Sequence, residues 1–255
     1  MLAMTSITHG IVGAAGSMGR ALPGLLSGTG AELIGVEKDS PESDWTRLWQ
    51  CDVIWLAVSR DVAGELMKGK RLRPSQLVID ICSIKRGISE SVALTGAAHL
   101  SLHPMHGPHI HADRQKWFLI GPRDRVPESA ASVLTYLEGL GITLIETDSA
   151  NHHDFMMGIL LGLKEIMTLV MDRLTRTYAA DCDREAFDIA ALLEWSSPVA
   201  NAVYGAYVHS VLRSEDWLRN ELVTHAHGAL LQSASRALAE LAGELTGLDL
   251  EDEFR

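Results

Sequence analysis

Cysteine is scarce in this sequence, which has only Cys51, Cys82 and Cys182. No two of them form a CxxC pair, which argues against a zinc ribbon or a disulfide framework and predicts reduced, buried thiols. Long apolar runs are also missing, because the most apolar one, residues 155–163, is too short to span a bilayer. The N-terminus shows no basic flank and no small-residue cleavage site, so we expect no signal peptide. These absences predict a soluble cytoplasmic protein with no membrane partner.

Positive charge is in deficit, since 22 Lys and Arg residues stand against 33 Asp and Glu residues and give a net charge of −11. Nucleic acids and anionic membranes bind clustered Lys and Arg, so the balance argues against both as the main partner. The chain is 47% hydrophobic and 22% charged, which is typical of a globular protein. Its 255 residues allow one large domain or two smaller ones, with a core that needs no disulfide or metal.

The first half of the chain alternates short β-branched runs with helical patterns. Strands are predicted at residues 7–12, 31–36, 53–58 and 77–81, with further short strands at 98–102, 117–121 and 143–146. Helices are predicted at residues 18–26 and 62–67. Strands separated by helical crossovers predict an α/β fold: a Rossmann-type, doubly wound parallel sheet with helices on both faces.

The second half of the chain carries no strand signal. Helical patterns cover residues 151–177, 184–212 and 215–244. Helices this apolar would expose large faces if they stood alone, so docking or dimerisation is expected. We therefore predict a dinucleotide-binding domain over residues 1–149, and an all-α substrate and dimerisation domain over 150–255 that forms a homodimer.

A glycine-rich turn joins the first strand to the first helix. Such a turn lets backbone N–H groups reach a pyrophosphate at the N-terminus of a helix. The predicted cofactor-binding residues are Gly13, Ala14, Gly16, Ser17, Met18 and Gly19 in this turn, Glu37 after the second strand, and Val58 and Ser59 after the third. An acidic residue at the position of Glu37 accepts hydrogen bonds from ribose hydroxyls and repels a 2′-phosphate, which favours NAD over NADP.

Ser83 and His103 each follow or end a predicted strand, at the edge where doubly wound sheets bind their ligands. His103 precedes a proline, and histidine is the side chain whose ordinary pKa lies near neutrality. We predict that His103 is a fixed proton acceptor.

Five segments of the chain together resemble the prephenate dehydrogenase family (cyclohexadienyl dehydrogenases). They are IVGAAGSMG at 11–19, DICSIK at 80–85, LHPMHGP at 102–108, HHDFMMGI at 152–159 and LLEWSSP at 192–198. The resemblance implies a Rossmann domain, a helical dimerisation domain and an active site between them. It also implies oxidative decarboxylation of an anionic cyclohexadienyl substrate with NAD or NADP. In that family His103 matches the catalytic histidine that binds the substrate's C4 hydroxyl, and Ser83 matches the serine that orients it.

The chain departs from the family pattern at substrate-binding positions. Glu165 stands where the family has a second histidine, and His209 stands where it has an arginine, with Arg213 about one helical turn further on. The candidate substrate-binding residues are Ser83, His103, His106, Glu165, His209 and Arg213. These departures suggest a shifted substrate, and one candidate is 4-amino-4-deoxyprephenate, oxidised to 4-aminophenylpyruvate in an antibiotic pathway, because a carboxylate can pair with an amine.

Two further patterns leave alternatives open. His103, His106, His109 and His111 lie close together, but no cysteine or well-spaced carboxylate completes a metal site, so we expect no metal. The segment 152–154, His-His-Asp, is read either as polar residues at a helix N-terminus or as part of a pocket. A non-catalytic dinucleotide-binding protein is the alternative function, and the presence of both Ser83 and His103 argues against it.

Overall fold

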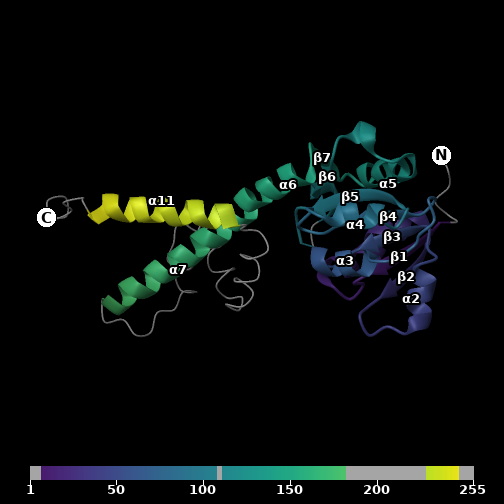
Figure 1. Ribbon diagram of the computed structural model, residues 1–255, viewed down its shortest axis with the longest axis horizontal. Coiled ribbons are helices and arrows are strands. Elements are labelled where there is room, and N and C mark those ends of the chain that lie inside the picture. Colours follow the sequence, from purple (N-terminus) through teal and green to yellow (C-terminus); the bar gives the residue numbers. More distant parts are fainter. Residues whose placement is uncertain (1–6, 108–110, 182–227, 247–255) are drawn as a thin grey trace. The chain divides into compact units, whose positions relative to one another are not determined.

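The computed structural model describes residues 7–107, 111–181 and 228–246 (Figure 1). The chain divides into two compact units, Met1–Asp154 and Phe155–Arg255. No helix among the described residues combines the length and apolar character needed to cross a membrane.

The first unit is built on one seven-stranded sheet with the order β2-β1-β3-β4-β5-β6-β7. Its strands are β1 (Thr8–Val12), β2 (Glu32–Val36), β3 (Val53–Leu56), β4 (Leu77–Asp80), β5 (Ala98–Pro104), β6 (Lys116–Ile120) and β7 (Thr143–Thr147). The first five run parallel, as the alternating pattern predicts. The predicted Rossmann-type fold class is confirmed, and the switch in strand order lies between β1 and β3.

The last two strands run against the other five, which the sequence did not indicate. β6 pairs antiparallel with β5, with His103 opposite Phe118, and β7 is parallel to β6. The described part of the β5–β6 connection holds only one short 3-10 turn, Ala112–Arg114, whereas a parallel crossover normally uses a dozen or more residues and a helix. The β6–β7 connection does contain a helix, α5 (Glu128–Gly139), and it is a parallel crossover.

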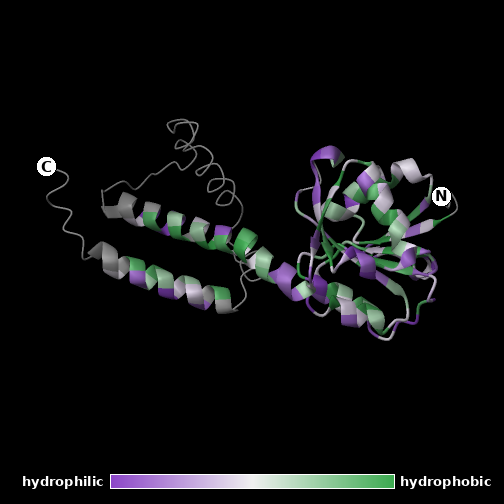
Figure 2. Ribbon diagram, turned by 90° about the horizontal axis from the view of Figure 1, so that it is seen from above, coloured by the Kyte–Doolittle hydropathy of each residue, from purple (hydrophilic) through white to green (hydrophobic). Residues whose placement is uncertain are grey.

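Helices cover both faces of the sheet and bury two separate apolar clusters. α1 (Ser17–Leu26) and α5 pack on one face, and α2 (Glu42–Leu48), α3 (Arg60–Met67) and α4 (Ile88–Ala93) pack on the other. Along β3 the side chains alternate between the two clusters, with Trp55 on the first face and Leu56 on the second. In Figure 2 the strands are correspondingly green between helices of mixed colour.

Two of the three cysteines lie in this unit. Cys51 and Cys82 are buried free thiols, as predicted, and Cys182 lies outside the described residues. Burial is the main cause that raises the pKa of Cys82 to about 12. Cys82 is therefore an unreactive thiol in the core.

The described part of the second unit is helical. It consists of the end of α6 (Ala150–Met157), a π-helical turn at Gly158–Gly162, α7 (Leu163–Asp181) and α11 (Gly228–Thr246). The single helix predicted over residues 151–177 is thus divided by the π turn, whose extra residue changes the phase of the apolar pattern. The predicted helical pattern at 184–212 lies outside the described residues.

A buried histidine in β1 makes the stability of the first unit pH-dependent. His9 is fully buried and accepts a hydrogen bond from Trp55 Nε1 at 3.0 Å through Nδ1. Burial lowers the pKa of His9 from about 6.5 to about 4, against a smaller opposing effect of Asp52. In that interval the unfolded chain binds the proton and the folded chain does not, so stability falls as the pH falls.

We predict that the free energy of unfolding decreases by up to about 1.4 kcal/mol per pH unit on acidification below pH 6.5. His9→Gln removes the titrating group and should flatten this slope in urea titrations between pH 4 and 7. The control is His111→Gln, at an exposed position, which should keep the wild-type slope. A slope that is equally steep in His9→Gln would assign the effect to other groups.

Candidate active site

The glycine-rich turn closes tightly between β1 and α1. Gly13 has a φ of +80°, and its N–H donates to Val36 O at 2.9 Å. A Cβ at Gly13 would lie 2.6 Å from Ala57 O, and one at Gly19 would lie 1.9 Å from Gly13 O. Only glycine therefore fits at these two positions, which are the tight turn and the close packing of helix on strand.

The other predicted cofactor residues lie around this turn. Gly16 precedes α1, and Ser17 and Met18 form its first residues. The carboxylate of Glu37 follows β2 and accepts a hydrogen bond from the N–H of Ala15. At the end of β3, Val58 has its Cγ1 2.7 Å from the place of a Gly13 Cβ, and Ser59 precedes α3. The turn, the acid and the end of β3 thus meet at the β1–β3 switch point.

His103 lies in β5 and is only 5% exposed. Its Nδ1 is 2.9 Å from Nε2 of His153, a residue of α6 that is 50 positions away in the sequence. The two rings meet edge to face with centroids 5.0 Å apart, and Phe118 meets His153 in the same manner at 5.5 Å. The sequence left the role of His153 open, and the structure places it in the candidate site.

The carboxylate of Asp154 links His153 to the backbone of the loop after β4. Nδ1 of His153 is 3.0 Å from Asp154 Oδ1, and the N–H groups of Lys85 and Arg86 donate to the same carboxylate at 2.9 and 3.1 Å. Burial alone would raise the pKa of Asp154, but the hydrogen bonds from His153 and from the two backbone groups lower it below its usual range. Burial lowers the pKa of His153 in turn. The pair is therefore an ionised carboxylate beside a neutral imidazole.

A buried ion pair also anchors the loop that follows β4. The side chains of Asp80 and Lys85 are both 0% exposed, and the ammonium of Lys85 donates to Asp80 Oδ1 and, at 2.6 Å, to Leu102 O. Burial alone would raise the pKa of Asp80, but the charge of Lys85 and a 2.9 Å contact with His99 Nε2 hold it well below its usual range. The pair ties the end of β4 to β5 directly beside His103. In this segment the sequence predicts a site role for Ser83 but none for Asp80 or Lys85.

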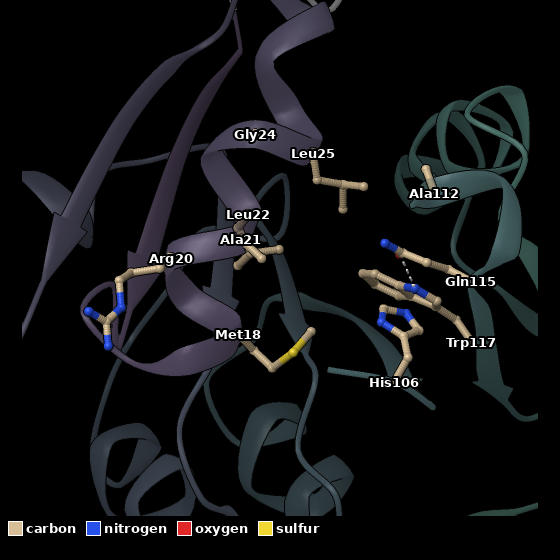
Figure 3. Close-up of a pocket in the computed structure, with 10 residues that line it drawn as sticks. All are labelled: Met18, Arg20, Ala21, Leu22, Gly24, Leu25, His106, Ala112, Gln115 and Trp117. Carbon is tan, nitrogen blue, oxygen red and sulfur yellow. Dashed lines mark hydrogen bonds between the residues drawn. The ribbon is translucent and has the colours of Figure 1, made fainter. Parts of the chain in front are cut away.

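A cavity of about 370 Å³ lies on the α1 face of the sheet (Figure 3). Met18 and Leu25 of α1 form one wall, and His106 and Trp117 form the opposite one. Trp117 Nε1 donates to Gln115 Oε1 at 3.0 Å, and the rings of His106 and Trp117 are 6.3 Å apart. The cavity brings together Met18, predicted to bind cofactor, and His106, predicted to bind substrate.

The remaining predicted residues have different outcomes. Ser83 is half-buried in the loop after β4, two residues from Lys85. His153 is one hydrogen-bond partner of His103. Glu165 lies in α7, and His209 and Arg213 lie outside the described residues. Within residues 7–107, 111–181 and 228–246, no three His, Cys, Asp or Glu side chains gather closely enough to hold a metal.

No protein-family model and no curated protein matches the sequence. Solved structures do resemble it. The arogenate dehydrogenase of Synechocystis is 20% identical with a TM-score of 0.60, over 94% of this chain and 91% of its own. The prephenate dehydrogenase of A. aeolicus, solved with hydroxyphenyl propionate and NAD+, is 13% identical with a TM-score of 0.60, over 97% and 92%.

A third solved structure shows that the fold also occurs in a dehydrogenase named for a different substrate. The 3-hydroxyisobutyrate dehydrogenase of Mycobacterium tuberculosis is 16% identical with a TM-score of 0.53, over 97% of both chains. Because dehydrogenases named for different substrates share this fold, the fold by itself does not identify the substrate. The likenesses establish that this chain has the fold of the prephenate and arogenate dehydrogenases.

Proposed function

We propose that the chain is an NAD-dependent dehydrogenase of the prephenate dehydrogenase family, which oxidises and decarboxylates a cyclohexadienyl substrate to a 4-substituted phenylpyruvate. The observation that carries this proposal is the setting of His103. The histidine lies at the carboxyl end of β5, hydrogen-bonded to the buried His153–Asp154 pair. The glycine-rich turn lies at the same edge of the sheet. A base and a dinucleotide site on one edge are what such an oxidation needs.

The glycine-rich turn fits a dinucleotide. Its glycines leave space that a Cβ would fill, and the first N–H groups of α1 have no partner within the helix. Glu37 is held at this turn and would face the ribose hydroxyls, which favours NAD over NADP. A nicotinamide bound here supplies the acceptor for the hydride that leaves the substrate's carbinol carbon.

His103 supplies the other half of the oxidation. As the hydride leaves, the C4 carbon gains ketone character, and His103 takes the proton of the C4 hydroxyl. The ring carboxylate then leaves as CO2, its bonding electrons make the ring aromatic, and the C4 oxygen, now a phenolate, takes the proton back from His103. We infer that Ser83, on the loop that the backbone N–H groups of Lys85 and Arg86 fasten to Asp154, contacts the substrate.

A second substrate is favoured by Glu165 in α7. This residue replaces the histidine of the family that the sequence resembles, and a carboxylate pairs with an amine better than a histidine does. The amino analogue 4-amino-4-deoxyprephenate is therefore the alternative substrate.

Initial rates of NADH formation with prephenate, arogenate and 4-amino-4-deoxyprephenate test the proposal on the purified chain. Turnover of any of the three supports the family chemistry, and the ratio of kcat/KM values identifies the substrate. Prephenate as clearly the best substrate would overturn the amino alternative. If the chain binds NAD tightly but turns over none of the three substrates, the proposed enzymatic activity is wrong and the chain is a non-catalytic dinucleotide-binding protein.

Gly19→Ala tests the cofactor site by itself. A methyl group 1.9 Å from Gly13 O must displace the turn, so we expect NAD binding to weaken at least about tenfold, or about 1.4 kcal/mol. Gly24→Ala, in the same helix, is the matched control, because a Cβ there meets nothing within 4 Å. Titration calorimetry gives both affinities, and thermal melting checks that each variant is folded. Equal affinities for the two variants would place the cofactor elsewhere.

A further inference from the structure

The hydrogen bonds from Asp154 to His103 have a direction that chemistry fixes at one end. An ionised carboxylate only accepts hydrogen bonds, so Nδ1 of His153 donates across the 3.0 Å contact with Asp154. A neutral imidazole carries one N–H, so Nε2 of His153 is an acceptor. Nδ1 of His103, 2.9 Å from that Nε2, must therefore be the donor of the second bond. The proton-accepting lone pair of His103 is then on its Nε2.

We propose that His153 and Asp154 are positioning residues that hold His103 in the tautomer with its proton on Nδ1 and its basic lone pair on Nε2. The proposal rests on the proposed function, because it concerns the base of that reaction. It adds two residues to the site and states which nitrogen of His103 accepts the substrate's proton.

The surroundings keep both positioning residues from turning. Asp154 is held by the backbone N–H groups of Lys85 and Arg86, so its carboxylate is oriented before any ligand arrives. The ring of His153 is fully buried and meets Phe118 edge to face. Phe118 pairs with His103 across β5 and β6, so the same strand pair that carries the base also fixes its partner.

A fixed tautomer matters because the wrong one presents an N–H where the reaction needs a lone pair. In the Ser-His-Asp proteases, changing the carboxylate that sets the histidine tautomer lowers kcat by about 10⁴-fold. Asp154, His153 and His103 form a similar arrangement, in which a carboxylate sets the tautomer of the base. Here the imidazole of His153 lies between the carboxylate and the base.

Nitrogen NMR of the chain labelled with ¹⁵N-histidine tests the tautomer without substrate or cofactor. The signals of His103 are identified by their loss in His103→Asn. In the wild type we expect a protonated Nδ1 and an unprotonated Nε2 for His103 at pH 8. His153→Phe removes the acceptor and should shift His103 toward the other tautomer. His103 with its proton on Nε2 in the wild type, or with an unchanged tautomer in His153→Phe, would overturn the proposal.

Kinetics supply the second arm. His153→Phe should lower kcat by about 10²–10⁴-fold and leave the affinity for NAD unchanged. His153→Gln puts an amide oxygen near the place of Nε2, so it should recover most of kcat, and it keeps the test usable if the Phe variant does not fold. His152→Asn, at the exposed neighbouring position, is the control and should match the wild type. A Gln variant as impaired as the Phe variant would indicate a role in packing alone.

The two arms separate this proposal from the proposed function. The expected tautomer without turnover of any cyclohexadienyl substrate would support the proposed positioning and overturn the function. Turnover that depends on His103, with the opposite tautomer, would do the reverse.

Discussion

His103→Asn should reduce kcat for the proposed oxidation by about 10²–10⁴-fold, the usual contribution of a general base. Asparagine has no group that accepts a proton near neutral pH, so the C4 hydroxyl must lose its proton to water. The change lies at the end of β5, outside the glycine-rich turn, so the affinity for NAD should stay within a factor of about two of the wild type.

Stopped-flow and steady-state formation of NADH measure this loss, with His152→Asn as the control. His152 is next to the positioning residue in α6, but its ring faces the exposed Asp148 at 3.2 Å. Equal kcat values for His103→Asn and the wild type would remove His103 from the mechanism. If NAD affinity falls in parallel with kcat, His103 supports the structure of the carboxyl-terminal edge of the sheet and does not act as the base.

The sequence was informative where structure depends on local pattern. The short continuous apolar runs of β3 and β4 follow directly from burial on both faces of a parallel sheet. Gly13 and Gly19 were recognisable because a turn that admits a pyrophosphate excludes a Cβ at fixed spacing. His103 could be chosen because it ends a strand at the edge where ligands bind.

The parts that could not be predicted depend on contacts between distant segments. The bond between His103 and His153 joins residues 50 positions apart, and no local pattern indicates it. The direction of β6 was also hidden, since a short strand has the same pattern in either direction. The burial of Lys85 was hidden as well, because charged side chains are rarely buried and only the tertiary fold supplies Asp80 and Leu102 O as its partners.

Lys85→Met should destabilise the first unit by about 3–5 kcal/mol, since it leaves the carboxylate of Asp80 buried without its ion-pair partner. That is a large share of the roughly 5–15 kcal/mol that holds a typical domain folded. Urea unfolding followed by tryptophan fluorescence measures the loss. Lys68→Met is the matched control, because the Lys68–Glu65 pair is about 70% exposed at each side chain and should contribute under about 1 kcal/mol.

The double variant Asp80→Asn/Lys85→Met separates the ion pair from the packing of the lysine stem. Removing both charges leaves no buried ion without a partner, so the double variant should be more stable than Lys85→Met alone. If the double variant is less stable than the single one, Lys85 acts mainly through its packing and its bond to Leu102 O. If Lys85→Met is no more destabilising than Lys68→Met, the pair does not fasten the loop. In that case the anchoring of Asp154, and with it the orientation of His153, must come from the backbone N–H groups of Lys85 and Arg86 alone.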